Sequence, residues 1–376
     1  MIYLDHNAST PVDPEVADAV HSVLRLNYGN PSSGHRIGLI GKTAVEKARA
    51  EVAGCINASP EEICFTSGGT ESNNLAILGT AFNKEKGHVI TSAIEHPSVM
   101  NPCRYLERNG FEVSYVAVDR EGRVAADEVR KAIKKETILI TIMHANNETG
   151  VLQPVEEIGT IARERGISFH TDAAQSVGKV PVDVEKLKAD LLTIVSHKFY
   201  GPKGVGALSV RKGIQLKPIL FGAGHEKGLR PGTENVPGIV GLGKACEMTT
   251  LFLKERAGHM RKVTELLFIG LRERLQDVRI NGHQVLRLPN TLNICIPGVD
   301  STNLLEAIKD DVAATAGSAC HSGQRTPSPV LVAMGVTEAD ALSSVRLSTG
   351  KDTTEEEIKA AVEIIAKAAQ SLLKKQ

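Results

Sequence analysis

The residue with the clearest chemical potential is Lys198, because its neighbours in Ser196–Tyr200 carry no formal charge. The apolar run Leu191–Val195 precedes it and predicts a buried strand, and Gly201-Pro202 follows it and predicts a turn at the strand's end. Partial burial disfavours the ammonium form of a lysine, lowers its pKa and makes the amine nucleophilic toward an aldehyde. Lys198 is therefore a Schiff-base candidate, although a surface lysine at a strand end would show the same local pattern.

A glycine turn at Ser67–Asn74 opens a predicted helix and could hold a phosphate group. It contains Gly69 and Thr70 and leads into an apolar-periodic segment. Free backbone amides at a helix N-terminus, the helix dipole and the Thr70 hydroxyl together suit a dianionic phosphate. A Gly-Gly-Thr turn is also a common way simply to start a helix, so this motif alone decides little.

Three further polar side chains follow predicted strands. Asp172 ends the run that begins at Ile167, and a carboxylate there could keep a pyridine nitrogen protonated. Gln175 could donate to a phenolic oxygen, and His96 could stack on a flat heteroaromatic ring and pass protons. Asp172 could instead cap the next helix, and His96 could be an ordinary loop residue. Taken with Lys198 and the phosphate turn, these residues point to pyridoxal phosphate as cofactor.

Cys320 differs from the other five cysteines because it lies among small and flexible residues, in Val312–Gln324. Such a cysteine is accessible, and His321 beside it could favour the nucleophilic thiolate. Cys64 and Cys295 lie in apolar, strand-like runs and are predicted to be inert. No two cysteines have C-x-x-C spacing, so the sequence indicates no metal site and no dithiol redox site.

Beyond these residues, the chain resembles the cysteine desulfurase group of the class V aminotransferases, with features similar to selenocysteine lyases. The resemblance covers almost the whole chain, and its motifs are Tyr3–Thr10, Tyr28–Ser33, Asn146–Gly150, Arg230–Asn235 and Val345–Ser348. It implies an α/β chain with the type I fold of pyridoxal phosphate-dependent transferases. The large domain, 16–255, would hold a mostly parallel seven-stranded sheet. A smaller α+β domain, 1–15 and 256–376, would carry the Cys320 loop.

The resemblance also implies which residues form the site. Those that would bind pyridoxal phosphate are Gly69, Thr70, His96, Asn147, Asp172, Gln175, Ser196, His197, Lys198 and Thr233. Lys198 would hold the cofactor, with His96 stacked on its ring, Asp172 at its ring nitrogen and Gln175 at its phenolic oxygen. Thr233 would reach the phosphate from the second subunit of a homodimer.

Substrate and sulfur roles follow from the same resemblance. Asn147 and Arg346 would orient the amino acid, with the guanidinium gripping its carboxylate through two hydrogen bonds. Lys198, His96 and Cys320 would be the catalytic residues, and Cys320 would accept the sulfur. Many relatives have a serine three residues before the lysine, where this chain has Val195 followed by Ser196.

The implied reaction converts L-cysteine to L-alanine and leaves a persulfide on Cys320. The sulfur would pass to an acceptor protein such as an iron–sulfur scaffold, or toward another sulfur-containing cofactor or a tRNA. Cys320-His321-Ser322, with Ser328–Leu331 after it, is equally similar to selenocysteine lyases, which release selenium from L-selenocysteine. An aminotransferase or other lyase without sulfur transfer, and a catalytically inactive binding subunit of the same fold, remain as alternatives.

Composition agrees with a cytoplasmic enzyme of this size. The 376 residues suffice for a large core and two domains. Lys and Arg total 44, as do Asp and Glu, so no charge excess favours nucleic acid or an anionic membrane. No apolar run approaches the roughly 18 residues that span a bilayer. The chain opens without a basic and apolar leader, so we expect no secretion.

Predicted strands and helices alternate along the chain, which indicates a mostly parallel sheet with helices on both faces and a ligand at the strands' carboxyl ends. The predicted strands include Val113–Val118, Ile138–Met143, Ile167–Thr171 and Leu191–Val195. The predicted helices include Val155–Arg165, a long polar helix from about Lys254 to Leu275, and Thr354–Leu373. The acidic start of the last helix is typical of a capping box.

Overall fold

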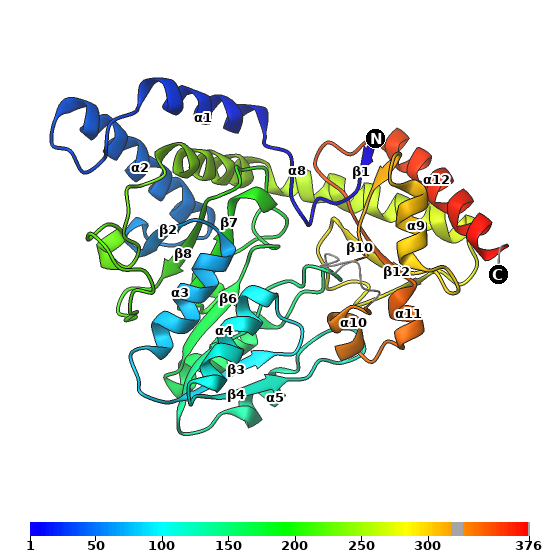
Figure 1. Cartoon of the computed structure of the whole chain (residues 1–376), viewed down its shortest axis with the longest axis horizontal. Helices are drawn as coiled ribbons and strands as arrows, with labels where there is room; N and C mark the ends of the chain where they lie inside the picture. Colours follow the sequence, from blue (N-terminus) through cyan, green and yellow to red (C-terminus); the bar gives the residue numbers. More distant parts are fainter. Residues whose placement is uncertain (317–325, 375–376) are drawn as a thin grey trace.

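The central feature of the fold is a seven-stranded sheet. The computed structural model describes residues 1–316 and 326–374. The strand order is β2-β8-β7-β6-β5-β3-β4 (Figure 1). In that order the strands are Ile63–Thr66, Gly206–Val210, Leu191–Val195, Ser168–Asp172, Thr137–Thr141, His88–Ser92 and Glu112–Val116. Only β8 runs against its neighbours, and the remaining pairs are parallel. The predicted fold class, with its mostly parallel seven-stranded sheet, is confirmed.

Helices cover both faces of this sheet, as a parallel sheet requires when both its faces are apolar. One face packs against α1 (Pro14–Leu26), α2 (Arg36–Cys55), α6 (Val155–Arg165) and the first half of α8 (Val236–Arg274) in a single apolar cluster. The opposite face packs against α3 (Gly69–Ala81) and α4 (Pro97–Arg108). The short connecting helices are η1 (Pro60–Glu62), α5 (Ala126–Ala132), α7 (Val184–Leu187), η2 (Ser196–Lys198) and η3 (Glu226–Gly228).

A second, smaller core lies beside the large one. Its antiparallel sheet has the order β12-β10-β9, with β12 at Ser344–Ser348, β10 at Thr291–Cys295 and β9 at Arg279–Ile280. This sheet packs against α9 (Ser301–Ile308), α12 (Glu355–Leu373) and the second half of α8. The short helices α10 (Pro329–Ala333) and α11 (Glu338–Leu342) complete this part.

The N-terminus joins the smaller core. Strand β1 (Ile2–Tyr3) pairs in parallel with β11 (Val312–Ala313), and Leu4 is buried among the residues of α8, α9 and α12. The grouping of 1–15 with 256–376 into one domain, with its exact boundaries, stays a prediction.

Helix α8 departs most from the sequence-based expectation, because it begins at Val236 and not near Lys254. Its first half is apolar and rich in glycine, and Gly243 lies so close to α2 that an added Cβ would stand 2.7 Å from Ala48. The helix runs from α1 and α2 to α12 and so spans both cores (Figure 1). Among the described residues it is the one helix long and apolar enough to cross a membrane, but 56% of its most apolar window is buried inside the protein.

Other boundaries agree more closely. α6 has the predicted bounds, and α12 begins with the predicted capping box between Thr354 and Glu357. Strands β4 and β5 end two residues earlier than predicted, at Val116 and Thr141. The reason at β4 is that Val118 leaves the sheet and bridges to Val124.

Candidate active site

A cavity of about 640 Å³ lies at the carboxyl ends of the central parallel strands. It is lined by residues from the ends of β3, β6 and β7, from the start of α3, from the N-terminal segment and from β12. The predicted site residues that line it are Gly69, Thr70, His96, Asn147, Asp172, Gln175, His197, Lys198 and Arg346. The tertiary structure thus brings together nine positions spread over nearly 280 residues of sequence.

Lys198 ends η2, directly after β7, and its amine lies in the cavity. Its Nζ donates to the main-chain oxygens of Asn7 (2.8 Å) and Ala8 (2.9 Å). Burial, together with the nearby Arg346 guanidinium, lowers the pKa of Lys198 to about 8. A sizeable fraction of this amine is therefore neutral near physiological pH, which is the form that attacks an aldehyde.

Asp172, the last residue of β6, is buried and presents its carboxylate to the cavity. Its Oδ2 accepts from Asn73 Nδ2 at 2.7 Å, and its Oδ1 accepts from the Ala174 amide at 2.9 Å. A carboxyl group held at this position suits a protonated pyridine nitrogen.

His96 is held in one tautomer by the helix that it caps. Its Nδ1 accepts from the Ser98 amide at 3.1 Å at the start of α4, so in the neutral ring the proton sits on Nε2. Burial lowers the pKa of His96, which favours that neutral ring. Asn73 Nδ2 donates both to Ser98 Oγ (2.8 Å) and to Asp172, and so links the positions of the imidazole and the carboxylate.

The start of α3 provides the candidate phosphate site. Gly68 has φ 144°, which favours glycine, and in the described part of the chain no side chain caps this helix. Its first amides therefore remain available to an anion. Gly69 is required for the close approach of α3 to β7, because an added Cβ would stand 2.6 Å from Val195 Cγ2.

Two predicted phosphate ligands do not reach this cavity. Ser196 is fully buried and outside the cavity lining, and its Oγ faces Gly201, where an added Cβ would come within 2.1 Å. The reason is that successive residues leave a strand on opposite sides, so Val195 faces the cavity and Ser196 points away. Thr233 is exposed and lies outside the cavity lining, so a role for it needs a second subunit.

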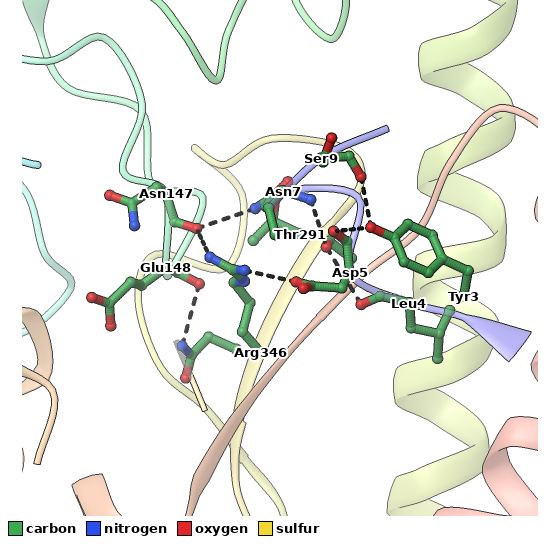
Figure 2. Close-up of polar contacts among 12 residues, drawn as sticks. Tyr3, Leu4, Asp5, Asn7, Ser9, Asn147, Glu148, Thr291 and Arg346 are labelled. Atoms are coloured by element: carbon green, nitrogen blue, oxygen red, sulfur yellow. Dashed lines mark hydrogen bonds and ion pairs between the residues drawn. The ribbon is translucent and has the colours of Figure 1, made fainter. Parts of the chain in front are cut away.

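Arg346, on β12, is buried and enters the cavity from the smaller core (Figure 2). Its Nη2 donates to Asp5 Oδ1 at 2.7 Å and its Nη1 to the main-chain oxygen of Asn147 at 2.9 Å. Its buried Nε has no hydrogen-bond partner among the described residues. The guanidinium therefore keeps donors free for a carboxylate ligand.

Asn7 ties the N-terminal segment to both sides of the cavity. Its Nδ2 donates to the Asn147 oxygen at 3.3 Å and to Thr291 Oγ1 at 2.9 Å (Figure 2). Its main-chain oxygen accepts from Lys198 and also from Gln175 Nε2, at 2.9 Å. Asn7 thus holds Lys198 and Gln175 at a fixed position relative to the smaller sheet.

Two buried carboxyl groups also face the cavity. Glu95 Oε1 accepts from Ser92 Oγ (2.6 Å) and from the Met143 amide (3.0 Å), and burial raises the pKa of Glu95 to about 8. Burial also raises the pKa of Glu148, whose Oε2 accepts from Ser328 Oγ at 2.5 Å. Glu95 is therefore mostly protonated at neutral pH.

Cys320 lies outside the described residues, so the structure gives it no position. On either side of that segment, Thr315 and Pro329 both line the cavity. Burial raises the pKa of Cys64 and, to about 12, that of Cys103, which agrees with unreactive core thiols. Among residues 1–316 and 326–374 no three His, Cys, Asp or Glu side chains form a metal-binding group.

The cavity fits pyridoxal phosphate on its own geometry. It offers an uncapped helix start for the phosphate, a lysine of lowered pKa for the aldehyde and a buried carboxylate for the ring nitrogen. The sequence profile of the family described as aminotransferase class V matches residues 2–361.

The chain belongs to the class V aminotransferase family. It is 45% identical over 374 residues to a protein named cysteine desulfurase IscS of Dictyoglomus turgidum, covering 99% of this chain and 95% of that one. It is 46% identical to a protein of the same name from Methanosarcina thermophila, covering 99% and 92% of the two chains.

Solved structures agree with these relatives. A structure titled NifS-like protein superposes with a TM-score of 0.92 at 38% identity, covering 98% of this chain and 99% of that one. Another, titled SspA in complex with cysteine, has a TM-score of 0.81 at 37% identity, covering 94% and 100%. As a class V aminotransferase of this kind, the protein is a pyridoxal phosphate-dependent enzyme.

The sequence reasoning missed several residues that shape this class V site. Asn73 lies four residues after Gly69 on α3, so one helical turn places it beside the phosphate turn, and this spacing is a usable signal. Glu95 directly precedes His96. Lys179 lies four residues after Gln175, and its amine donates to Gln175 Oε1 at 2.7 Å. The signal that could have identified Lys179 is a lysine placed among small and apolar residues.

Proposed function

We propose that this enzyme is a cysteine desulfurase, which converts L-cysteine to L-alanine and leaves the sulfur as a persulfide on Cys320. The observation that carries the proposal is one cavity that combines a lysine of lowered pKa with a buried arginine holding free donors. The relatives named cysteine desulfurase IscS, aligned over nearly the whole chain, support the same assignment.

Each residue has a defined task. Pyridoxal phosphate, when bound, supplies an aldehyde and an electron-accepting ring. Arg346 would hold the substrate carboxylate through its free N–H groups, and Asp172 would pair with the ring nitrogen of the cofactor. Lys198 binds the cofactor and, once its amine is free, accepts and returns the substrate's Cα proton. His96 offers its Nε2–H as a hydrogen-bond donor.

The sulfur balance needs no outside oxidant. Cys320 Sγ, as a thiolate, bonds to the substrate sulfur while the substrate's Cβ–S bond breaks. The sulfur leaves cysteine as a persulfide on the enzyme, and protons from the medium complete alanine. Transfer of this sulfur requires an acceptor protein with its own thiol, such as an iron–sulfur scaffold.

We also propose that the enzyme is a homodimer. Thr233 is exposed and lies outside the cavity of its own chain, so its predicted phosphate contact requires a second copy. Large apolar side chains that are exposed include Leu24, Leu26, Tyr28 and Phe221. Leu24, Leu26 and Tyr28 lie within five residues of one another, and exposed apolar side chains that gather in one patch often mark a protein–protein contact. Cytoplasmic localisation stays a prediction.

The decisive experiment measures alanine release by the cofactor-loaded protein with L-cysteine and with L-selenocysteine at equal concentrations. We expect cysteine turnover that falls at least about a hundredfold in Cys320→Ala, since removing an essential nucleophile removes the covalent step. Cys55→Ala, a half-buried cysteine elsewhere, is the matched control and should remain active.

Other outcomes would assign other functions. Strong preference for L-selenocysteine would identify a selenocysteine lyase. Keto acid formation that survives Cys320→Ala would identify an aminotransferase or a lyase without sulfur transfer. A protein that gains no visible absorbance with pyridoxal phosphate would contradict all of these assignments.

A further inference from the structure

Lys179 is a buried lysine beside the active site that the proposed reaction does not use. Only 3% of its surface is exposed. Its Nζ donates to Gln175 Oε1 at 2.7 Å and to Asn7 Oδ1 at 3.2 Å. Both of these partners in the described structure are neutral amides. Burying an amine without a carboxylate costs free energy, so this position calls for an explanation.

The contacts around Gln175 determine which way its amide faces. Its Nε2 donates to the Asn7 main-chain oxygen at 2.9 Å, which can only accept. Its Oε1 accepts from Lys179, whose ammonium form can only donate. Turning the amide over would set oxygen against oxygen and nitrogen against nitrogen. The second Nε2 hydrogen is therefore what this amide can offer to the cavity that Gln175 lines.

We propose that Lys179 is a positioning residue that holds Gln175 with an N–H, and not its carbonyl oxygen, toward the phenolic oxygen of pyridoxal phosphate. The proposal rests on the predicted contact between Gln175 and that oxygen. An N–H donor stabilises the ionised phenolic oxygen, whereas a carbonyl oxygen would repel it. Donation by Lys179 to Oε1 also polarises the amide and strengthens its N–H as a donor.

The charges around Lys179 are mostly positive. Lys198 and Arg346 both act on Lys179. Burial lowers the pKa values of His6 and His197, and Lys179 adds to that lowering. Burial, added to by Lys198 and Arg346, lowers the pKa of Lys179 well below its usual value. A neutral amine still has two N–H groups for its two acceptors. The tie to Gln175 therefore holds in either protonation state.

The test is the pH at which the visible absorbance band of the cofactor-loaded, substrate-free enzyme changes, since this midpoint reports ionisation of the bound cofactor. In Lys179→Met, which keeps the length and removes both donors, we expect the midpoint to rise by about one pH unit. Lys186→Met is the matched control, because its side chain is 79% exposed, and its midpoint should equal that of the wild type. Lower stability or partial loading reduces the band's amplitude without moving its midpoint. Lys179→Leu replaces the Met variant if that protein does not load.

A double-mutant cycle separates this inference from the role of Gln175. Gln175→Ala alone should raise the midpoint, and adding Lys179→Met to it should change little more. If Gln175→Ala raises the midpoint but Lys179→Met leaves it unchanged, Lys179 does not act through Gln175 and the inference is wrong. If the midpoint shifts of Gln175→Ala and Lys179→Met are equal and add fully in the double variant, the lysine charge acts on the cofactor independently of Gln175. That result would also overturn the inference. No shift in Gln175→Ala would reject the contact between Gln175 and the cofactor, while alanine release would still test the desulfurase assignment.

Discussion

Glu95 should make the stability of this enzyme fall as the pH rises from 5 to 8. Its carboxyl group is buried, and its Oε2 has no hydrogen-bond partner among the described residues. Burial raises its pKa from the ordinary 4.5 to about 8. Above pH 4.5 the unfolded chain loses this proton while the folded protein keeps it. The unfolded state is therefore favoured progressively, until the folded protein also ionises near pH 8.

The magnitude follows from the span between the two pKa values. The rise of the pKa from 4.5 to about 8 corresponds to a loss of about 5 kcal/mol in the free energy of unfolding. About 4 kcal/mol of this loss falls between pH 5 and pH 8. Glu95→Gln mimics the protonated acid, because its carbonyl oxygen can still accept from Ser92 and Met143. The variant should therefore lack this part of the pH dependence and should gain stability relative to the wild type as the pH rises.

Urea unfolding of wild type and Glu95→Gln at pH 5, 6, 7 and 8 tests the reasoning, with both proteins fully loaded with cofactor. We expect the difference in unfolding free energy between them to grow steadily with pH. Glu164→Gln, an exposed glutamate on α6, is the control and should run parallel to the wild type. If the Glu95→Gln curve also runs parallel, Glu95 is ionised in the folded protein and the reasoning fails.

Two further substitutions test the geometry of the site. Asn73→Ala removes the donor to Asp172 Oδ2 and should lower the unfolding free energy by about 1.5–3 kcal/mol, the cost of a lost bond to a buried charged group. Asn74→Ala, at a half-buried position on the same helix whose Nδ2 donates only to the neutral main-chain oxygen of Thr70 among the described residues, should cost much less in the same urea titration; equal losses would contradict the assignment. Gly69→Ala should cost about 1–3 kcal/mol and weaken cofactor retention on dialysis, because its Cβ would stand 2.6 Å from Cγ2 of the valine that ends β7. Gly54→Ala, with open space around it on α2, should be neutral or slightly stabilising, and a Gly69→Ala protein that behaves the same way would show that α3 can move away.

Much of the fold could be predicted because local patterns and tertiary structure agree. Leu191–Val195 is apolar except for Thr193 and forms a strand buried along its whole length. Thr354 and Glu357 form the capping box that their spacing predicts. The start of α8 was missed, because the glycines of its first half have low helix propensity. Packing against α2 overrides that propensity, since glycine permits the close approach of the two helices.

The candidate site divides in a similar way. Asp172 ends a strand, and His96 and Lys198 come shortly after one. The carboxyl ends of parallel strands meet at one edge of a sheet, so their meeting could be expected. Residue type and position alone could not predict whether the Ser196 side chain reaches the cavity. Side chains alternate in direction along a strand, so a shift of one position turns a side chain from the cavity to the opposite side. The family resemblance does not specify that direction.

The sequence by itself determined the chemical groups of this enzyme and the elements that carry them, because residue type sets reactivity and local periodicity sets helix and strand. Only the tertiary structure decided how those groups affect one another. The lowered pKa of Lys198, the tautomer of His96 and the amide orientation of Gln175 all depend on burial and on partners distant in sequence. Asn7 shows this most clearly: its main-chain oxygen lies 2.8 Å from the amine of Lys198, 191 residues away along the chain.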